Sequence, residues 1–247
     1  MSEDNKKVYI DFFGQLRIQT VHGVVTETDI NSPQMCKLIA YLVLNRKTVI
    51  SVDILTAILW PQGTEDPYMS LRGLVFRLRK VLKTAFPDES FIVAKNGSYA
   101  VNNYFSLSVD AEQLTVISKY KISSPAAKAF LDTHCQPFME LLSADIWGLP
   151  VCTFYNTRMI TYTVTAVAKM IDENDIDSAI LYASKGLVID PISEELHTLI
   201  ITALIRKGCR KLAIDHYNNT LLMFDKEYGI KPTLKFRNNL NRIIYSD

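Results

Sequence analysis

The sequence predicts an α+β N-terminal domain followed by an all-α C-terminal domain. Over the first thirty residues, apolar and polar side chains alternate with the period of two that is typical of β-strands. From about Ser108 onward, apolar residues recur almost only at helical spacing. We expect the boundary within residues 103–108, which divides the chain into domains 1–104 and 105–247.

The composition agrees with a globular protein of two domains. The chain has 247 residues, of which 48% are apolar and 21% are charged, and it contains no segment with the composition of a disordered tract. The formal net charge is only +1, so the charge of the whole chain points neither to nucleic acid nor to a membrane surface. Any basic surface must therefore be local.

The cysteines and the N-terminal segment indicate a cytoplasmic protein. The four cysteines show no metal-ligand spacing, and three of them lie in apolar helical contexts where a reduced, buried thiol is the ordinary state. The first ten residues are polar and then strand-like, unlike a secretory signal. No apolar run approaches the roughly 18 residues of a membrane span, so we expect no membrane partner.

Turn and capping residues define the first elements of the N-terminal domain. Gly14 and the pair His22-Gly23 separate the alternating segments, which predicts short antiparallel strands. Ser32 is placed as the N-cap of a helix, and Pro33 occupies its first position, where the missing N–H is tolerated.

Two further helices and a hairpin complete this domain. Ser51 is placed to cap the segment VDILTAILW, which ends at Pro61. Pro67 begins another helix that runs to about Phe86. After it, the turn KNGS separates FIVA from YAV, and an Asn-Gly pair between alternating apolar runs is a strong hairpin signal.

The helix that begins at Pro67 contains the stretch SLRGLVFRLRKVLK, residues 70–83, in which all charged residues are basic. Helical spacing places Leu71, Leu74, Val75, Leu78 and Leu82 on a core-facing stripe. The opposite face carries Arg72, Phe76, Arg79, Lys80 and Lys83, with Gly73 and Arg77 at its margin. Like charges at this spacing repel one another, and a polyanion would relieve that repulsion. The alternative is an ordinary exposed helix whose arginines pair with acids elsewhere in the fold.

The second half of the chain contains a repeat of 34 residues. With Ala179 aligned on Ala213, Asn174 falls on Gly208, and both of these residues tolerate the left-handed conformation that ends a helix. Small residues at this period predict tetratricopeptide-like helix pairs, which usually present a surface to another protein. A generic helical bundle is the alternative.

The neighbours of the basic helix favour a winged helix-turn-helix. One helix precedes it through a short connection and a hairpin follows it. In that geometry the second helix enters the major groove of DNA and the hairpin reaches the flanking backbone or minor groove. Lys95 and Asn96 lie at the predicted wing tip, where a cation attracts phosphate.

These segments carry a family resemblance. NRKTVISVDILTAILWP, LRGLVFRLRKVL and IVAKNGSYAV together resemble the OmpR/PhoB-type winged helix. The whole chain, from about residue 8 to residue 243, is similar to the SARP family of bacterial transcriptional activators (Streptomyces antibiotic regulatory proteins). FFGQLRI resembles the opening strand motif of that family, and EYGIKPTLKFRNNL resembles its closing segment. The resemblance implies that the second domain is a bacterial transcriptional activator domain built of tetratricopeptide-like repeats.

The resemblance also implies roles for individual residues. Arg77 falls on a recognition-helix arginine near bases, Arg79 on one near phosphate, Ser70 near the phosphate-binding helix start, and Lys95 on the basic residue of the wing. Gly73 and Phe76 depart from the family pattern, and Phe76 either contacts thymine methyl groups or packs inward. The complete set of predicted DNA-binding residues is Ser70, Arg72, Phe76, Arg77, Arg79, Lys80, Lys83, Lys95 and Asn96.

The sequence contains none of the short motifs that mark common catalytic or cofactor sites. It has no phosphate loop, no glycine-rich dinucleotide turn, no HExxH and no Cys/His cluster, so we expect no enzyme, no cofactor and no metal. We therefore expect a sequence-specific DNA-binding transcriptional regulator. The resemblance implies an activator that binds tandem promoter repeats as a homodimer and contacts RNA polymerase. The alternative is a repeat-built adaptor whose basic helix binds an acidic protein.

Overall fold

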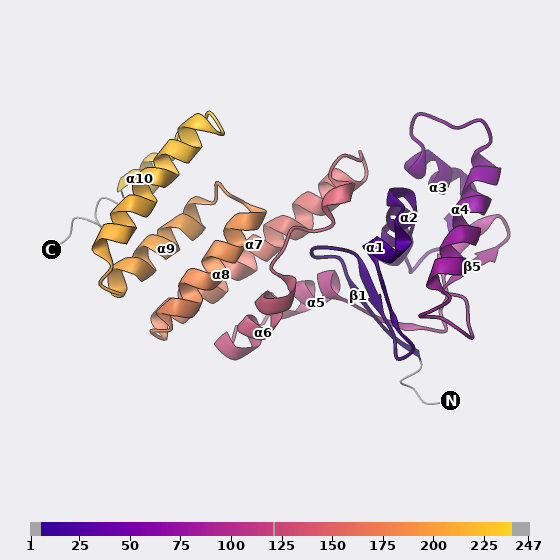
Figure 1. Cartoon of the computed structure of the whole chain (residues 1–247), viewed down its shortest axis with the longest axis horizontal. Coiled ribbons are helices and arrows are strands. Elements are labelled where there is room, and N and C mark those ends of the chain that lie inside the picture. Colours follow the sequence, from indigo (N-terminus) through magenta and orange to yellow (C-terminus); the bar gives the residue numbers. More distant parts are fainter. Residues whose placement is uncertain (1–5, 121, 239–247) are drawn as a thin grey trace. The chain divides into compact units, whose positions relative to one another are not determined.

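The computed structural model describes residues 6–120 and 122–238, which form two compact units. The N-terminal unit contains residues 1–113 and 138–152, and the helical unit contains residues 114–137 and 153–247. The elements of both units can be followed along the chain in Figure 1. The predicted fold class, an α+β region followed by an all-α region, is confirmed.

The N-terminal unit begins with a four-stranded sheet of order β3-β2-β1-β7. Strand β1 spans Lys7–Asp11, β2 spans Arg17–Gln19 and β3 spans Val24–Thr26, and consecutive strands pair antiparallel. The apolar residues of the alternating pattern, such as Val8, Ile10 and Ile18, are fully buried. The predicted short antiparallel strands are confirmed.

The fourth strand of this sheet departs from the prediction that the pattern is almost only helical from about Ser108 onward. Ser106–Val109 forms β7, which pairs parallel to β1, and α5 (Asp110–Ile117) begins only after it. Asp110 is buried, and its carboxylate accepts hydrogen bonds from the backbone N–H groups of Phe12 and Phe13 at 2.7 and 2.8 Å. Burial raises the pKa of Asp110 to about 7. The carboxyl therefore holds the end of β1 rather than only capping its own helix.

Three helices of the N-terminal unit begin where the sequence predicts, and one short helix before them was not predicted. Helix α1 (Glu27–Ile30) is followed by α2 (Pro33–Leu44), whose N-cap Ser32 accepts a hydrogen bond from the N–H of Met35. The short strand β4 (Ile50–Ser51) leads into α3 (Val52–Leu59), which Ser51 caps, and α4 spans Pro67–Leu82. The capping roles predicted for Ser32 and Ser51 are confirmed.

Residues 138–152 return to the N-terminal unit after the chain has formed α6. The ring of Phe138 packs on the rings of Phe12 and Phe13, with distances between ring centroids of 5.6 and 5.5 Å. The short helix η2 (Glu140–Leu142) follows. Lys37 on α2 forms an ion pair with Asp145 at 2.8 Å. The first unit therefore includes β7 and residues 138–152, both of which lie beyond the domain boundary predicted after residue 104.

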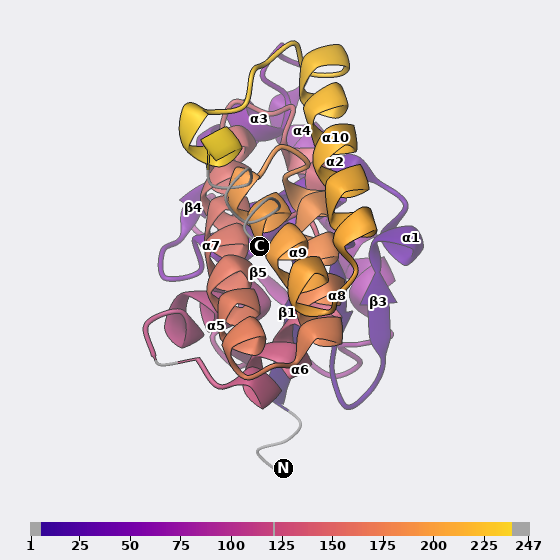
Figure 2. The same ribbon diagram turned by 90° about the vertical axis from the view of Figure 1, so that its left-hand side faces the viewer.

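The helical unit contains α6 (Ser124–His134), most of α7 (Gly148–Asp172), α8 (Ile176–Ile189), α9 (Glu194–Arg206) and α10 (Arg210–Lys226). Helix α9 packs against both α8 and α10, and Figure 2 shows the three helices from a second direction. The 34-residue period is visible in the elements themselves, because α8 begins at Ile176 and α10 at Arg210. The tetratricopeptide assignment itself stays a prediction.

Two details of the repeat agree with the alignment of the sequence. Ala179 and Ala213 are both fully buried at the contacts between helices. Asn174 and Gly208 end their helices with φ angles of 61° and 79°, so the predicted left-handed conformation is confirmed at both positions.

All four cysteines are free, and Cys36, Cys135 and Cys152 are buried. Burial raises the pKa of the Cys36 thiol to about 12 and that of Cys152 to about 11, which keeps both as unreactive thiols at neutral pH. Among the described residues, no helix combines the length and the apolar character needed to cross a membrane.

Candidate nucleic-acid interface

Helices α3 and α4 form a helix-turn-helix whose two ends are fixed by local contacts. The connection between them turns at Gly63, which has φ 84°, and Asp66 caps α4 by accepting a hydrogen bond from the N–H of Met69 at 2.9 Å. The hydroxyl of Tyr68 donates a hydrogen bond to Asp53 of α3 at 2.5 Å. The start of α4 is thereby held against α3.

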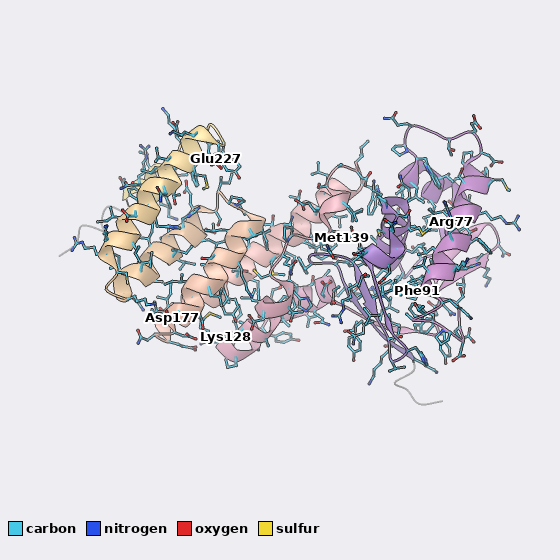
Figure 3. The ribbon with its side chains drawn as sticks, in the orientation of Figure 1. Arg77, Phe91, Lys128, Met139, Asp177 and Glu227 are labelled. Carbon is cyan, nitrogen blue, oxygen red and sulfur yellow. The ribbon has the colours of Figure 1, made fainter. Side chains whose placement is uncertain are left out.

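Helix α4 has one buried face and one exposed face. The predicted core stripe, Leu71, Leu74, Val75, Leu78 and Leu82, is fully buried. Arg72, Arg77, Lys80 and Lys83 are exposed, and Arg77 is labelled in Figure 3. Among residues 6–120 and 122–238, no ion pair involves a cation of α4. In the described part of the chain, the arginines of this helix are therefore not neutralised by acidic side chains.

The wing is the three-stranded sheet of order β4-β6-β5. Strands β5 (Ile92–Lys95) and β6 (Ser98–Val101) pair antiparallel, and the turn between them has φ 50° at Asn96 and 70° at Gly97. Two consecutive positive φ angles are typical of the type I′ hairpin turn that an Asn-Gly pair favours. The N–H of Val52 donates to the carbonyl of Gly97 at 3.1 Å, which connects the wing tip to the start of α3. Lys95 and Asn96 are exposed at this tip.

The predicted site residues of α4 differ in how exposed they are. Arg72, Phe76, Arg77 and Lys80 lie together on the exposed face of α4 and project away from the fold. Ser70 is half-buried, with its hydroxyl 3.4 Å from that of Thr64. The exposed fraction of Phe76 is 71%, which decides between its two readings, because the ring does not pack inward.

Two of the predicted cations bind backbone carbonyls of the fold. Arg79 is half-buried, and its Nε and Nη2 atoms donate to the carbonyl of Ile92 at 3.1 and 2.7 Å. The ammonium group of Lys83 donates to the carbonyl of Pro87. Arg79 thus connects α4 to the first wing strand, a contact that could not be predicted from the sequence because Ile92 lies in a separate element.

Replacement of Arg79 by alanine should destabilise the N-terminal unit by about 1 to 1.5 kcal/mol, because the Ile92 carbonyl would lose both charge-assisted hydrogen bonds from a half-buried guanidinium group. Both tryptophans of the chain, Trp60 and Trp147, lie in this unit, so urea unfolding followed by tryptophan fluorescence measures its stability. Lys80→Ala is the matched control, and as an exposed change it should cost less than about 0.5 kcal/mol. Equal stability of the two variants would contradict the anchoring role.

Two further exposed residues at the start of α4 were not predicted from the sequence. The exposed fraction of Tyr68 is 60% and that of Met69 is 61%. Met69 lies one turn before Gly73 on the same stripe as Phe76 and Lys80. Extending the helical periodicity one turn towards Pro67 would have found it.

Comparison with known proteins agrees with this arrangement. Residues 128–244 match the model of the bacterial transcriptional activator domain. The chain also resembles the solved structure of Mycobacterium tuberculosis EmbR in complex with a low-affinity phosphopeptide, with 20% sequence identity and a TM-score of 0.64 over 96% of this chain. The family match covers the second half of the chain, and the likeness in fold extends over nearly all of it. The prediction that the second half contains a bacterial transcriptional activator domain is therefore confirmed.

This chain and the EmbR chain differ in length. This chain spans 65% of the length of the EmbR chain. The search of curated proteins found no match. The closing segment, EYGIKPTLKFRNNL, extends beyond residue 238, and its last residues lie outside the described part of the chain.

Proposed function

We propose that this chain is a sequence-specific DNA-binding transcriptional regulator that acts as an activator. The observation that carries the proposal is the exposed face of α4, where Arg72, Arg77 and Lys80 project without acidic partners among the described residues. Such a face attracts the phosphates of duplex DNA, and a helix of this diameter fits the major groove. The wing tip, with Lys95 and Asn96, supplies a second contact to the backbone beside the groove.

The partners are those that the sequence resemblance to the SARP family implies. We infer that two copies bind tandem promoter repeats and that the helical unit contacts the partner protomer or RNA polymerase. Arg77 reads base edges, whereas Ser70, Lys80 and Lys95 face phosphates. The protein acts in the cytoplasm, bound to the nucleoid when it occupies its promoter.

The affinity of the full chain for duplex DNA should fall steeply with salt. If about six phosphates are contacted, the association constant should fall by a factor of about 10³ between 50 and 200 mM salt, because each contact releases condensed counterions. The measurement is fluorescence anisotropy with a duplex selected by the protein from a random pool, compared with an unselected duplex. Selected DNA should bind more tightly at every salt concentration.

The same titration tests the adaptor alternative. An adaptor whose basic helix binds an acidic protein would retain both duplexes weakly and without preference. That outcome would show that the proposed function is wrong.

A further inference from the structure

The central stripe of the exposed face of α4 carries two large apolar side chains beside Lys80, and both margins of the face are basic. Met69 and Phe76 have exposed fractions of 61% and 71%, and both lie on the stripe that includes Lys80. Arg72 and Arg77 lie on either side of this stripe. Large apolar groups in this position are in contact with water in the free protein. Exposed apolar side chains beside cations are typical of a surface that binds a partner with both negative charge and apolar groups.

Gly73 lies between these two residues on the same stripe. No contact within the described chain explains why this position is a glycine. It lies in the interior of α4, is exposed, and does not have a positive φ angle. A Cβ atom added at Gly73 would meet nothing within 4 Å. Alanine at this position would favour the helix more than glycine does, because it lowers the conformational entropy lost on folding. Neither packing nor backbone conformation therefore explains the glycine.

A close approach of another molecule to the helix backbone would explain it. Glycine is the residue that lets a partner come nearest to the main chain. The residues around Gly73 define the chemistry of that partner, because Arg72, Arg77 and Lys80 attract anions while Met69 and Phe76 bury apolar groups. The major groove of DNA offers both, since phosphates line its edges and the C5-methyl group of thymine is the apolar group on its floor.

We propose that α4 reads thymine methyl groups, with Phe76 and Met69 in contact with the methyls and Gly73 as the point where the helix backbone approaches the base edges. The proposal rests on the proposed function and adds to it the class of base and the residues that recognise it. Phe76 is then a specificity-determining residue, and Gly73 sets the depth of insertion.

The test compares one selected duplex synthesised with thymine and with deoxyuridine, which removes only the C5-methyl groups. The wild-type full chain should bind the deoxyuridine duplex at least fivefold more weakly, a change in the range of a few lost apolar contacts. Phe76→Ala should bind the thymine duplex more weakly and should distinguish the two duplexes by less than twofold. Phe76→Leu, which keeps an apolar side chain, should retain part of the discrimination.

The second arm concerns Gly73. Gly73→Ala should raise the melting temperature of the free protein, because alanine is the better helix former, and should weaken binding to the selected duplex tenfold or more. Opposite changes of stability and affinity are not expected from a residue with a purely structural role. Arg72→Ala is the matched control on the same turn, and it should weaken binding to thymine and deoxyuridine duplexes equally.

Two results would overturn the inference while leaving the proposed function intact. They are equal binding of the thymine and deoxyuridine duplexes by the wild type, and unchanged affinity of Gly73→Ala, each with steep salt dependence retained. Loss of salt dependence and of preference for the selected duplex in the wild type would instead show that the proposed function is wrong, and the inference with it.

Discussion

The triple variant Arg72→Glu/Arg77→Glu/Lys80→Glu should bind its selected duplex about 10³-fold more weakly than the wild type at 100 mM salt. Three attractive contacts to phosphate become three repulsive ones, and a loss of about 4 kcal/mol corresponds to that factor. None of the three side chains has an ion pair within the described residues, so removing them breaks no stabilising contact that we observe. The free energy of unfolding of the triple variant, measured by tryptophan fluorescence, should differ from that of the wild type by less than about 0.5 kcal/mol.

The matched control changes the net charge of the chain by the same amount at a different place. Arg210, Lys211 and Lys226 are exposed on α10, in the helical unit. Their replacement by glutamate should weaken duplex binding much less, because only the long-range field changes. Equal losses for the two triple variants would mean that overall charge, not α4, governs binding.

Acid should destabilise the helical unit through a pair of histidines between α9 and α10. His197 Nδ1 lies 3.0 Å from His216 Nε2, and His197 Nε2 lies 2.9 Å from the carbonyl of Pro191. A carbonyl only accepts, so His197 must carry its proton on Nε2, and its Nδ1 then accepts the proton of His216 Nε2. The pair is therefore satisfied when both rings are neutral.

The pKa values of both histidines agree with this arrangement. Burial lowers the pKa of His197, and burial together with the neighbouring His197 lowers the pKa of His216 from 6.5 to about 4. The unfolded chain therefore takes up protons at a higher pH than the folded chain does. The stability that depends on His216 is complete above about pH 6.5 and is lost as the pH falls from there towards 4.

The expected size of this effect is about 1 to 2 kcal/mol between pH 7 and pH 5, allowing for the part of His216 that solvent reaches. His216→Gln keeps a hydrogen-bond donor but has no ionisation, so its stability should fall less over the same range. Urea unfolding followed by far-UV circular dichroism at both pH values measures the difference. His22→Gln, at an exposed histidine of the N-terminal unit, should behave as the wild type; identical pH dependence of all three proteins would contradict the prediction.

Elements with local signals could be predicted from the sequence. Ser51 and Pro67 define the starts of α3 and α4 through capping and the first helical position, which involve only the next three residues. The hairpin at Asn96-Gly97 depends on two φ angles of adjacent residues. The buried stripe of α4 followed from helical periodicity alone. In each case the deciding interaction lies within a few residues along the chain.

Features that depend on distant partners could not be predicted in the same way. The four residues of β7 are too few to distinguish a strand from the beginning of a helix, and the partner strand β1 lies about a hundred residues earlier. The same limitation applies to Arg79, whose exposed-face position in the helical pattern gave no sign of the Ile92 carbonyl. The candidate site was thus predicted as a face of α4, but only the structure shows which of its cations bind backbone carbonyls of the fold.

The parallel pairing of β7 with β1 has a consequence for any fragment of this protein. A polypeptide that ends at residue 104 lacks β7, so the N–H and C=O groups along one side of β1 would be left open. An unpaired strand edge forms hydrogen bonds with strands of other molecules, so we expect such a fragment to self-associate.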